Sequence, residues 1–300
     1  ENEYRSYTPL NTSYVEKGAT AIYRNKDVSD KVVTTYTDAS NNEITLSDIV
    51  TTSETYYYAT YSISYEKLNA TAKRKIVVAD TVDMSINFLE LGNHNTGDCT
   101  YIKAGDVDIL IDAGSRQNSA DTIYNYLTQP GRVEDGKLEY VIATHAHQDH
   151  IAAFTDTKDR QGIFSRFEVE TIIQFANANT DSGVYKSYQE LVNKEVEAGA
   201  TLYKANQFFG ANKVREPLFD IAPGVTMEVL YQKFYDEKTS DENDYSVCTL
   251  FRQDELSYLF TGDLEKDGEA SLVASNDLPE EELMPDGAKC ECGCTEFTQE

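Results

Sequence analysis

The chain has 300 residues, of which 40% are hydrophobic, and this is enough for a buried core and natural for two domains. Asp and Glu total 52 against 26 Lys and Arg, so the formal net charge is −26. Such a charge repels phosphate backbones and anionic lipid, and no stretch approaches 18 consecutive apolar residues. We therefore expect no tight nucleic-acid binding and no membrane span.

Residues 1–82 are predicted to form a small all-β module. Apolar and polar side chains alternate over residues 57–65 as in a half-buried strand, and residues 75–78 and 31–36 read as further strands. Turns are expected at residues 38–42 and at Asn69. The stretch resembles the bacterial immunoglobulin-like modules of surface proteins, which implies a small sandwich. An irregular β-rich extension of the following domain is the alternative.

Residues 83–280 are predicted to form a larger α/β domain, followed by a tail over residues 281–300. One helix is expected to be capped by Ser119, a second covers residues 184–196 and stops at Gly199, and a short one covers residues 269–274. Strands are expected at residues 86–91, 107–112, 140–143, 171–173, 225–230, 245–251 and 258–260. Strands and helices mixed in this order favour sheets covered by helices.

Three of the four histidines lie within six residues, in the segment Thr144-His145-Ala146-His147-Gln148-Asp149-His150. Residues two apart in an extended segment point the same way, so His145 and His147 can bind one metal ion. Asp149 and His150, at the end of the loop, can then reach a second ion. Imidazole and carboxylate suit zinc or a similar divalent ion. The alternative is a histidine-rich surface loop without function.

A carboxylate that could join this cluster lies in Thr261-Gly262-Asp263, directly after the strand predicted at 258–260. An Asp after a Gly is often only a turn residue. At the end of a strand in the same domain, however, Asp263 can bridge two metal ions, and such a pair can polarise a substrate and activate water.

The pattern His145-x-His147-x-Asp149-His150 resembles the signature of the metallo-β-lactamase superfamily. Further blocks resemble the ComEC-type hydrolases within it: residues 88–92, 97–98, 109–114, 243–246 and 259–265. The resemblance covers about residues 85–280. It implies an αββα sandwich, a dinuclear zinc site and hydrolysis, with manganese and iron as open alternatives for the metal.

The same resemblance implies a role for each candidate residue. His145 and His147 would bind the first ion, Asp149 and His150 the second, and Asp263 would bridge them. Asp149 would also orient or deprotonate the attacking water. Supporting contacts from behind the ligands are expected from Asp112, Thr144 and Asn243.

The chain lacks histidines that are often present in the family pattern. No His occurs in residues 151–262 or anywhere after His150, although relatives often supply a further ligand there. We therefore expect the second metal ion to bind more weakly than the first. Unassigned donors are His94 and the tail cysteines Cys290, Cys292 and Cys294, while Cys99 and Cys248 are expected to be core residues.

These observations favour a secreted or surface-anchored bacterial hydrolase that acts on a phosphodiester or phosphate ester. A small-molecule or polymeric ester is the expected partner, and the oligomeric state is open. The competing hypothesis is a surface-binding protein with a degenerate metal site, in which the β module provides the activity.

Overall fold

The computed structural model describes residues 4–66, 68–91 and 97–276, and the chain divides into two compact units. The first unit extends to Met84 and includes Lys103–Val107 and Asp220–Val225. The second contains Ser85–Ile102, Asp108–Phe219 and the chain from Thr226 onward. The domain boundaries at 82/83 and 280/281 stay predictions, and residues 281–300 lie outside the described part. No helix among the described residues is long and apolar enough to cross a membrane.

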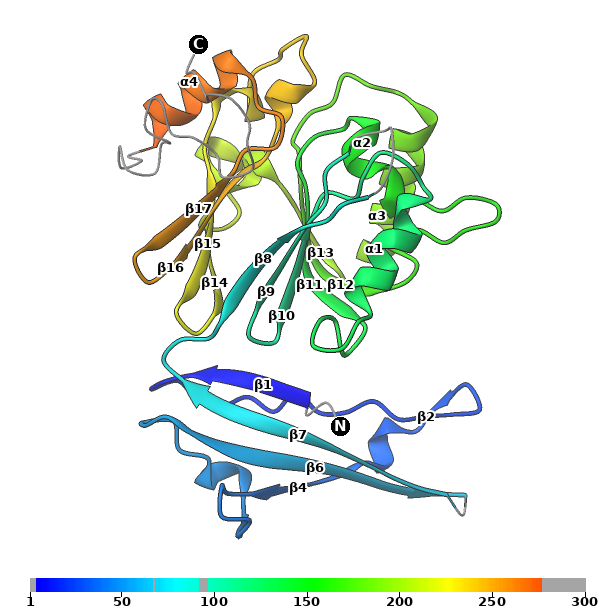
Figure 1. The fold of residues 1–300 in the computed structure, drawn as a ribbon, viewed down its shortest axis with the longest axis vertical. Coiled ribbons are helices and arrows are strands. Elements are labelled where there is room, and N and C mark those ends of the chain that lie inside the picture. Colours follow the sequence, from blue (N-terminus) through cyan, green and yellow to red (C-terminus); the bar gives the residue numbers. More distant parts are fainter. Residues whose placement is uncertain (1–3, 67, 92–96, 277–300) are drawn as a thin grey trace. The chain divides into compact units, whose positions relative to one another are not determined.

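The first unit is built on one five-stranded sheet with the order β1-β7-β6-β4-β5, beside a two-stranded β2–β3 ribbon (Figure 1). Strand β1 pairs in parallel with β7, whereas β7, β6, β4 and β5 are joined by antiparallel pairs. The strands are β1 Tyr4–Pro9, β2 Ile22–Tyr23, β3 Lys26–Asp27, β4 Val33–Thr37, β5 Glu43–Ile44, β6 Thr55–Tyr65 and β7 Leu68–Ala79. The short 3-10 helices η1 and η2 are Ser29–Lys31 and Leu46–Asp48.

One face of this sheet is covered by irregular chain. Tyr57, Ala59, Tyr61, Ile76 and Val78 form its buried core. Partly buried residues pack against them: Leu10, Tyr14, Ala19, Val32 and Ile49 from the connecting segments, and Ile44 from β5. The described residues therefore bury this face under loops, and the immunoglobulin-like resemblance stays a prediction.

A partly buried polar network closes the same face. The hydroxyls of Tyr14, Tyr36 and Tyr61 all donate to the Glu16 carboxylate, and Arg74 pairs with it at 3.5 Å. These hydrogen bonds satisfy a charged group that would otherwise be costly to bury. They tie the segment before β2 to β4, β6 and β7.

The second unit contains most of two further sheets. The six-stranded sheet has the order β13-β12-β11-β10-β9-β8, with β10, β11, β12 and β13 parallel. The four-stranded sheet has the order β14-β15-β16-β17, and β16 and β17 are antiparallel. The first sheet comprises β8 Met84–Phe88, β9 Thr100–Ala104, β10 Val107–Ile111, β11 Lys137–Ala143, β12 Glu168–Gln174 and β13 Thr201–Lys204. The second comprises β14 Leu218–Ala222, β15 Val225–Leu230, β16 Cys248–Gln253 and β17 Leu256–Phe260.

Helices cover the outer faces of the two sheets (Figure 1). Beside the six-stranded sheet lie α1 Ser119–Leu127, α2 Gln148–Ile151 and α3 Gly183–Ala198. On the four-stranded sheet, Leu272 of α4 (Lys266–Ser275) packs with Leu230, Cys248 and Leu250. The remaining 3-10 helices are η3 Ala152–Phe154, η4 Ala205–Phe208, η5 Gly210–Asn212, η6 Lys233–Tyr235 and η7 Asn243–Tyr245. This arrangement agrees with the predicted α/β class and the αββα sandwich.

The structure departs most clearly from the predicted elements at three places. Asn69 lies within β7, because the turn comes earlier, where Glu66 has a left-handed φ of 49°. The helix that Ser119 was expected to cap has Asn118 at its N-cap position and buries Ser119 in its first turn. The strand predicted at 245–251 begins only at Cys248, because η7 turns the chain just before it.

Asp108 on β10 and Glu139 on β11 are neighbours in the sheet. From this pair we predict that the stability of the protein depends on pH. The Asp108 N–H donates to Glu139 Oε2 at 2.8 Å. Burial raises the pKa of Glu139 to about 8, and the nearby carboxylates of Asp135 and Asp108 add to the shift. A carboxyl whose folded pKa lies above its unfolded value holds its proton more tightly when folded, so the protein should lose stability as the pH rises through 8.

We expect Glu139→Gln to remove most of this loss, since the amide stays neutral and can still accept from Asp108. Each pKa unit corresponds to about 1.4 kcal/mol, and partial exposure reduces the effect, so we expect a gain of roughly 2 kcal/mol at pH 9. Urea unfolding at pH 5, 7 and 9 measures it. Glu190→Gln, on the exposed side of α3, is the matched control and should follow wild type. A wild-type pH profile for Glu139→Gln would contradict the prediction.

Candidate metal centre

The histidine loop begins where β11 ends. Val141, Ile142 and Ala143 are fully buried, as expected for a parallel strand covered on both faces, and the chain leaves the sheet at Thr144. The Val247 N–H donates to the Thr144 carbonyl oxygen at 2.9 Å, just before β16. The loop is thereby held between the two sheets.

Within the described residues, His145, His150 and Asp263 bring their ligand atoms within 4.8 Å of one another. His145 and His150 are at most 1% exposed, whereas the Asp263 side chain is 38% exposed. The Nε2 atom of His150 lies 3.3 Å from Oδ2 of Asp263. Two buried imidazoles and one accessible carboxylate form a donor set that suits zinc and similar divalent ions.

His147 lies beside this group. Its Nδ1 atom is 3.0 Å from Nε2 of His145, and the two rings meet edge to face. Two nitrogen ligands of a tetrahedral zinc ion are separated by about 3.3 Å, so both atoms can face one ion. His147 is half-buried and stands at the N-cap position of α2, which leaves its ring accessible.

Asp149 is half-exposed in the first turn of α2. Its carboxylate is not part of the 4.8 Å group among the described residues, and neither is the ring of His147. The predicted roles of Asp149 as a ligand and as the group that activates water stay predictions.

Asp112 lies behind the candidate ligands and bonds to two residues of the histidine loop. Its carboxylate accepts from the Thr144 N–H at 2.8 Å and from the Thr144 hydroxyl at 2.7 Å, and it lies 2.8 Å from Nδ1 of His150. Asp112 is 2% exposed and has a left-handed φ of 58°, which is unfavourable for a residue other than glycine. The free-energy cost of this backbone conformation is offset by three hydrogen bonds that orient both Thr144 and His150.

Thr144 and Ser246 orient the other buried ring. Their hydroxyl oxygens lie 3.1 and 3.4 Å from Nδ1 of His145. Asn243, by contrast, donates to Glu265 at 3.1 Å and contacts none of the three clustered residues. The supporting contact predicted for Asn243 is therefore made by Ser246, the other polar residue of the same Asn-x-x-Ser block.

Gly262 allows Asp263 to approach the loop. Its φ is 57°, and a Cβ atom there would lie 2.8 Å from Cβ of Thr144 and 2.9 Å from Oγ of Ser246. Both the left-handed backbone and the close contact require glycine. The turn after β17 can thus bring Asp263 against His150.

The surroundings shift the pKa values of the two buried histidines in opposite directions. Burial, reinforced by the neighbouring His150, lowers the pKa of His145 to about 3 and keeps this ring neutral. Burial also disfavours the charged form of His150, but the Asp112 and Asp263 carboxylates outweigh it and raise its pKa to about 11. The hydrogen bond from His150 lowers the pKa of Asp263. A metal ion bound here would displace a proton from Nε2 of His150.

Several other candidate donors fall outside this centre. Cys99 and Cys248 are buried free thiols whose pKa values are raised by burial, in agreement with a core role. His94, Cys290, Cys292 and Cys294 lie outside the described residues.

A family model of known proteins matches the segment of the chain that contains this site. The family model of the metallo-β-lactamase superfamily matches residues 93–163, a segment that contains Asp112 and the whole histidine loop. This part of the chain is therefore similar to that superfamily, whose members are generally hydrolases and typically bind metal ions. No curated protein matches the chain.

Among solved structures, the chain is similar to a metallo-β-lactamase with the HARLDQ motif from Cronobacter sakazakii. The identity is 12%, the match covers 65% of this chain and 71% of that one, and the TM-score is 0.35. It is also similar to a metallo-β-lactamase from Hirschia baltica at 12% identity, over 65% of this chain and 61% of that one, with a TM-score of 0.26.

Proposed function

We propose that this chain is a hydrolase of the ComEC-type branch that uses two zinc ions to cleave a phosphodiester or phosphate ester. The observation that carries the proposal is the group of buried His145, buried His150 and partly exposed Asp263, in which Asp112 orients His150. A purely structural core would not place an accessible carboxylate against two buried imidazoles. A secreted or cell-surface location remains part of the proposal.

The proposal assigns the candidate donors to two neighbouring metal positions, and the cluster of His145, His150 and Asp263 supports it. His145 and His147, with nitrogen atoms 3.0 Å apart, would hold the first ion, and His150 and Asp149 the second, with Asp263 between them. Two ions supply an activated water and a clamp on the attacking and leaving oxygens of an in-line displacement. This is why we favour a phosphate ester.

The chain's own residues prepare the site before any ion binds. Asp112 holds the imidazole of His150 by its Nδ1 atom, so that Nε2 faces Asp263. Thr144 and Ser246 hold Nδ1 of His145, so that Nε2 faces His147. Such fixed tautomers and ring orientations are what supporting residues of metal sites provide.

An activity screen tests the proposal. The zinc-loaded protein is incubated with phosphodiester, phosphomonoester, carboxylic ester and β-lactam reporter substrates, and we expect turnover of a phosphate ester that a chelator abolishes. The chelated protein followed by re-addition of zinc is the control for irreversible loss. Turnover of only a carboxylic ester or β-lactam would refute the substrate class, and no turnover of any reporter would count against the hydrolase.

The charge of the chain leads to a separate prediction about nucleic acid. With a net charge of −26, the protein should gain little from releasing the counterions of DNA. We expect no submicromolar binding of metal-free protein to duplex DNA at physiological salt. Fluorescence anisotropy with a labelled 20-base-pair duplex measures this. A dissociation constant below about 1 µM that weakens as salt rises would contradict it.

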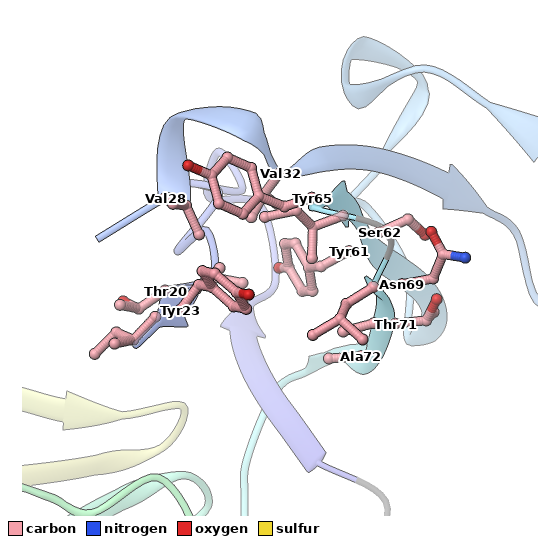
Figure 2. Close-up of a pocket in the computed structure, with 16 residues that line it drawn as sticks. Thr20, Tyr23, Val28, Val32, Tyr61, Ser62, Tyr65, Asn69, Thr71 and Ala72 are labelled. Carbon is pink, nitrogen blue, oxygen red and sulfur yellow. The ribbon is translucent and has the colours of Figure 1, made fainter. Parts of the chain in front are cut away.

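A second candidate function is a surface-binding protein whose metal site is degenerate. One observation favours it, a cavity of about 390 Å³ in the first unit (Figure 2). Its walls include Tyr61 and the pair Tyr23 and Tyr65, whose rings meet edge to face 5.4 Å apart, with Val28 and Val32 beside them. Such a lining suits a small apolar or aromatic ligand.

Metal content separates the two candidate functions, because an enzyme should hold close to two ions per chain and a degenerate binder one or none.

A further inference from the structure

The cavity of about 390 Å³ in the first unit lies where the hairpin of β6 and β7 extends past its neighbours. Strand β4 pairs with β6 only as far as Ser62, and β1 pairs with β7 only from Arg74 onward. Among the described residues, the end of the hairpin therefore has no further strand beside it. The segment 19–23, together with Val28 and Val32, lies against its inner face and encloses the cavity (Figure 2).

The sequence of the hairpin explains why this face is hollow. Ile63 on β6 is directly opposite Ala70 on β7, and Tyr61 is directly opposite Ala72. Opposite residues of paired strands lie on the same face, so each large side chain has only a methyl group beside it. The covering segment 19–23 contributes two more alanines to the lining. Small side chains on both walls leave the space that larger residues would fill.

The covering segment is fixed without any ligand. Just before it, the Gly18 carbonyl oxygen accepts from the Arg74 guanidinium at 2.9 Å. In its middle, the Ala21 N–H donates to the Ser29 hydroxyl at 2.9 Å, and the Ala21 carbonyl oxygen accepts from the Val28 N–H at 2.8 Å. A cavity whose walls are already ordered loses little conformational entropy when a ligand binds.

Aromatic carbon and aliphatic side chains dominate the lining. The rings of Tyr23 and Tyr65 meet edge to face with their centroids 5.4 Å apart. The Tyr61 hydroxyl donates to Glu16, so this residue offers the cavity its ring (Figure 2). Among the described residues that line the cavity, none carries a charge. An ion placed here would lose its hydration without gaining a partner, which favours a neutral ligand.

Two cations beside the tyrosines disfavour a positively charged ligand in particular. The Arg24 guanidinium lies over the Tyr23 ring, 5.2 Å from its centroid, and the Lys26 ammonium lies 3.5 Å from the Tyr65 hydroxyl oxygen. Neither side chain lines the cavity. Aromatic cages bind quaternary ammonium groups through the ring faces, but here both rings already have a cation beside them.

Three polar residues that border the cavity do not favour a sugar. Ser62, Asn69 and Thr71 alternate along the two strands with the inner-face residues, so their side chains project from the opposite face. The Asn69 amide oxygen accepts there from the Ser64 hydroxyl at 2.6 Å. The hydroxyl groups of a sugar would give up hydrogen bonds to water and find few replacements.

We propose that the first unit binds a small, neutral, planar ring compound in this cavity, between the Tyr23–Tyr65 pair and the alanine side of β7. The volume accommodates two fused aromatic rings. The inference does not depend on the metal centre, and the site would function whether or not the second unit is a hydrolase.

Three naphthalene derivatives that differ in charge test the site with the full chain. They are neutral 2-naphthol at pH 6, anionic 2-naphthalenesulfonate and cationic 2-naphthyltrimethylammonium, each titrated by calorimetry. We expect 2-naphthol to bind with a dissociation constant below about 1 mM, and both ions to bind at least tenfold more weakly. A chelator should leave these affinities unchanged, which separates this site from the proposed hydrolase.

Substitutions locate the binding in the cavity. Ala70→Phe adds a ring on the inner face at an exposed position of β7, so it should weaken 2-naphthol at least tenfold while leaving the fold intact. Tyr65→Ala removes one aromatic wall and should weaken it as well. Tyr56→Ala is the matched control, because Tyr56 lies on the other face of β6, where its ring meets Tyr58. It should bind 2-naphthol like wild type.

Thermal unfolding of each ligand-free variant shows whether the fold is kept. The inference is overturned if wild type does not bind 2-naphthol, or if a well-folded Ala70→Phe binds it unchanged. Equal binding of the charged derivatives would refute the neutral ligand class. Binding of a disaccharide such as cellobiose more tightly than 2-naphthol would show that the site is a carbohydrate site instead.

Discussion

Replacing His147 by alanine is expected to abolish hydrolysis while leaving the fold intact. His147 is half-buried at the start of α2, and its ring contacts His145 through atoms 3.0 Å apart. Little packing is lost when it is removed. In the proposed site, however, the first ion would lose one of its two imidazoles, and we expect a loss of activity on the order of 1,000-fold or more.

Metal analysis, circular dichroism and the reporter substrate identified by the screen check this prediction together. Gln148→Ala is the matched control, because Gln148 is the adjacent exposed residue of the same turn, and its side chain donates to the Ser115 carbonyl oxygen at 3.2 Å. It should retain both ions and nearly full activity. Full activity with normal metal content in His147→Ala would mean that this ring is not a ligand.

Replacing Asp263 by asparagine is expected to lower metal occupancy and to reduce the rate at least 100-fold. Its carboxylate lies 3.3 Å from Nε2 of His150, and the hydrogen bond from His150 lowers the pKa of Asp263, so the group is anionic at neutral pH. An amide has no negative charge and is a poor bridge between two cations. The side chain is partly exposed, so the exchange should not disturb the core.

Asp254→Asn makes the same exchange in the exposed turn at the other end of β17 and serves as the control. Asparagine tolerates the left-handed φ of 51° found there. The ratio of zinc to protein and the turnover number of both variants are compared with wild type. If Asp263→Asn behaves like Asp254→Asn, then Asp263 is only a turn residue.

The sequence alone identified the parts of the site that are close together along the chain. The spacing of His145, His147 and His150 is a local signal, and so is the apolar strand before them. Strong periodicity also located α3 and its stop at Gly199, because a buried helical face and a left-handed cap leave their marks in neighbouring residues. Short or edge strands such as β9, β13 and β14 carry weaker patterns and were not predicted.

Tertiary structure decided which distant residues complete the site. The motif Asn243-x-x-Ser246 could not show that Ser246 contacts His145 while Asn243 turns toward Glu265, because that choice depends on how η7 turns the chain before β16. Likewise, the parallel pairing of β1 with β7 joins segments about 70 residues apart along the chain. Non-local contacts of this kind are selected by the packing of the whole domain, and no short stretch of sequence encodes them.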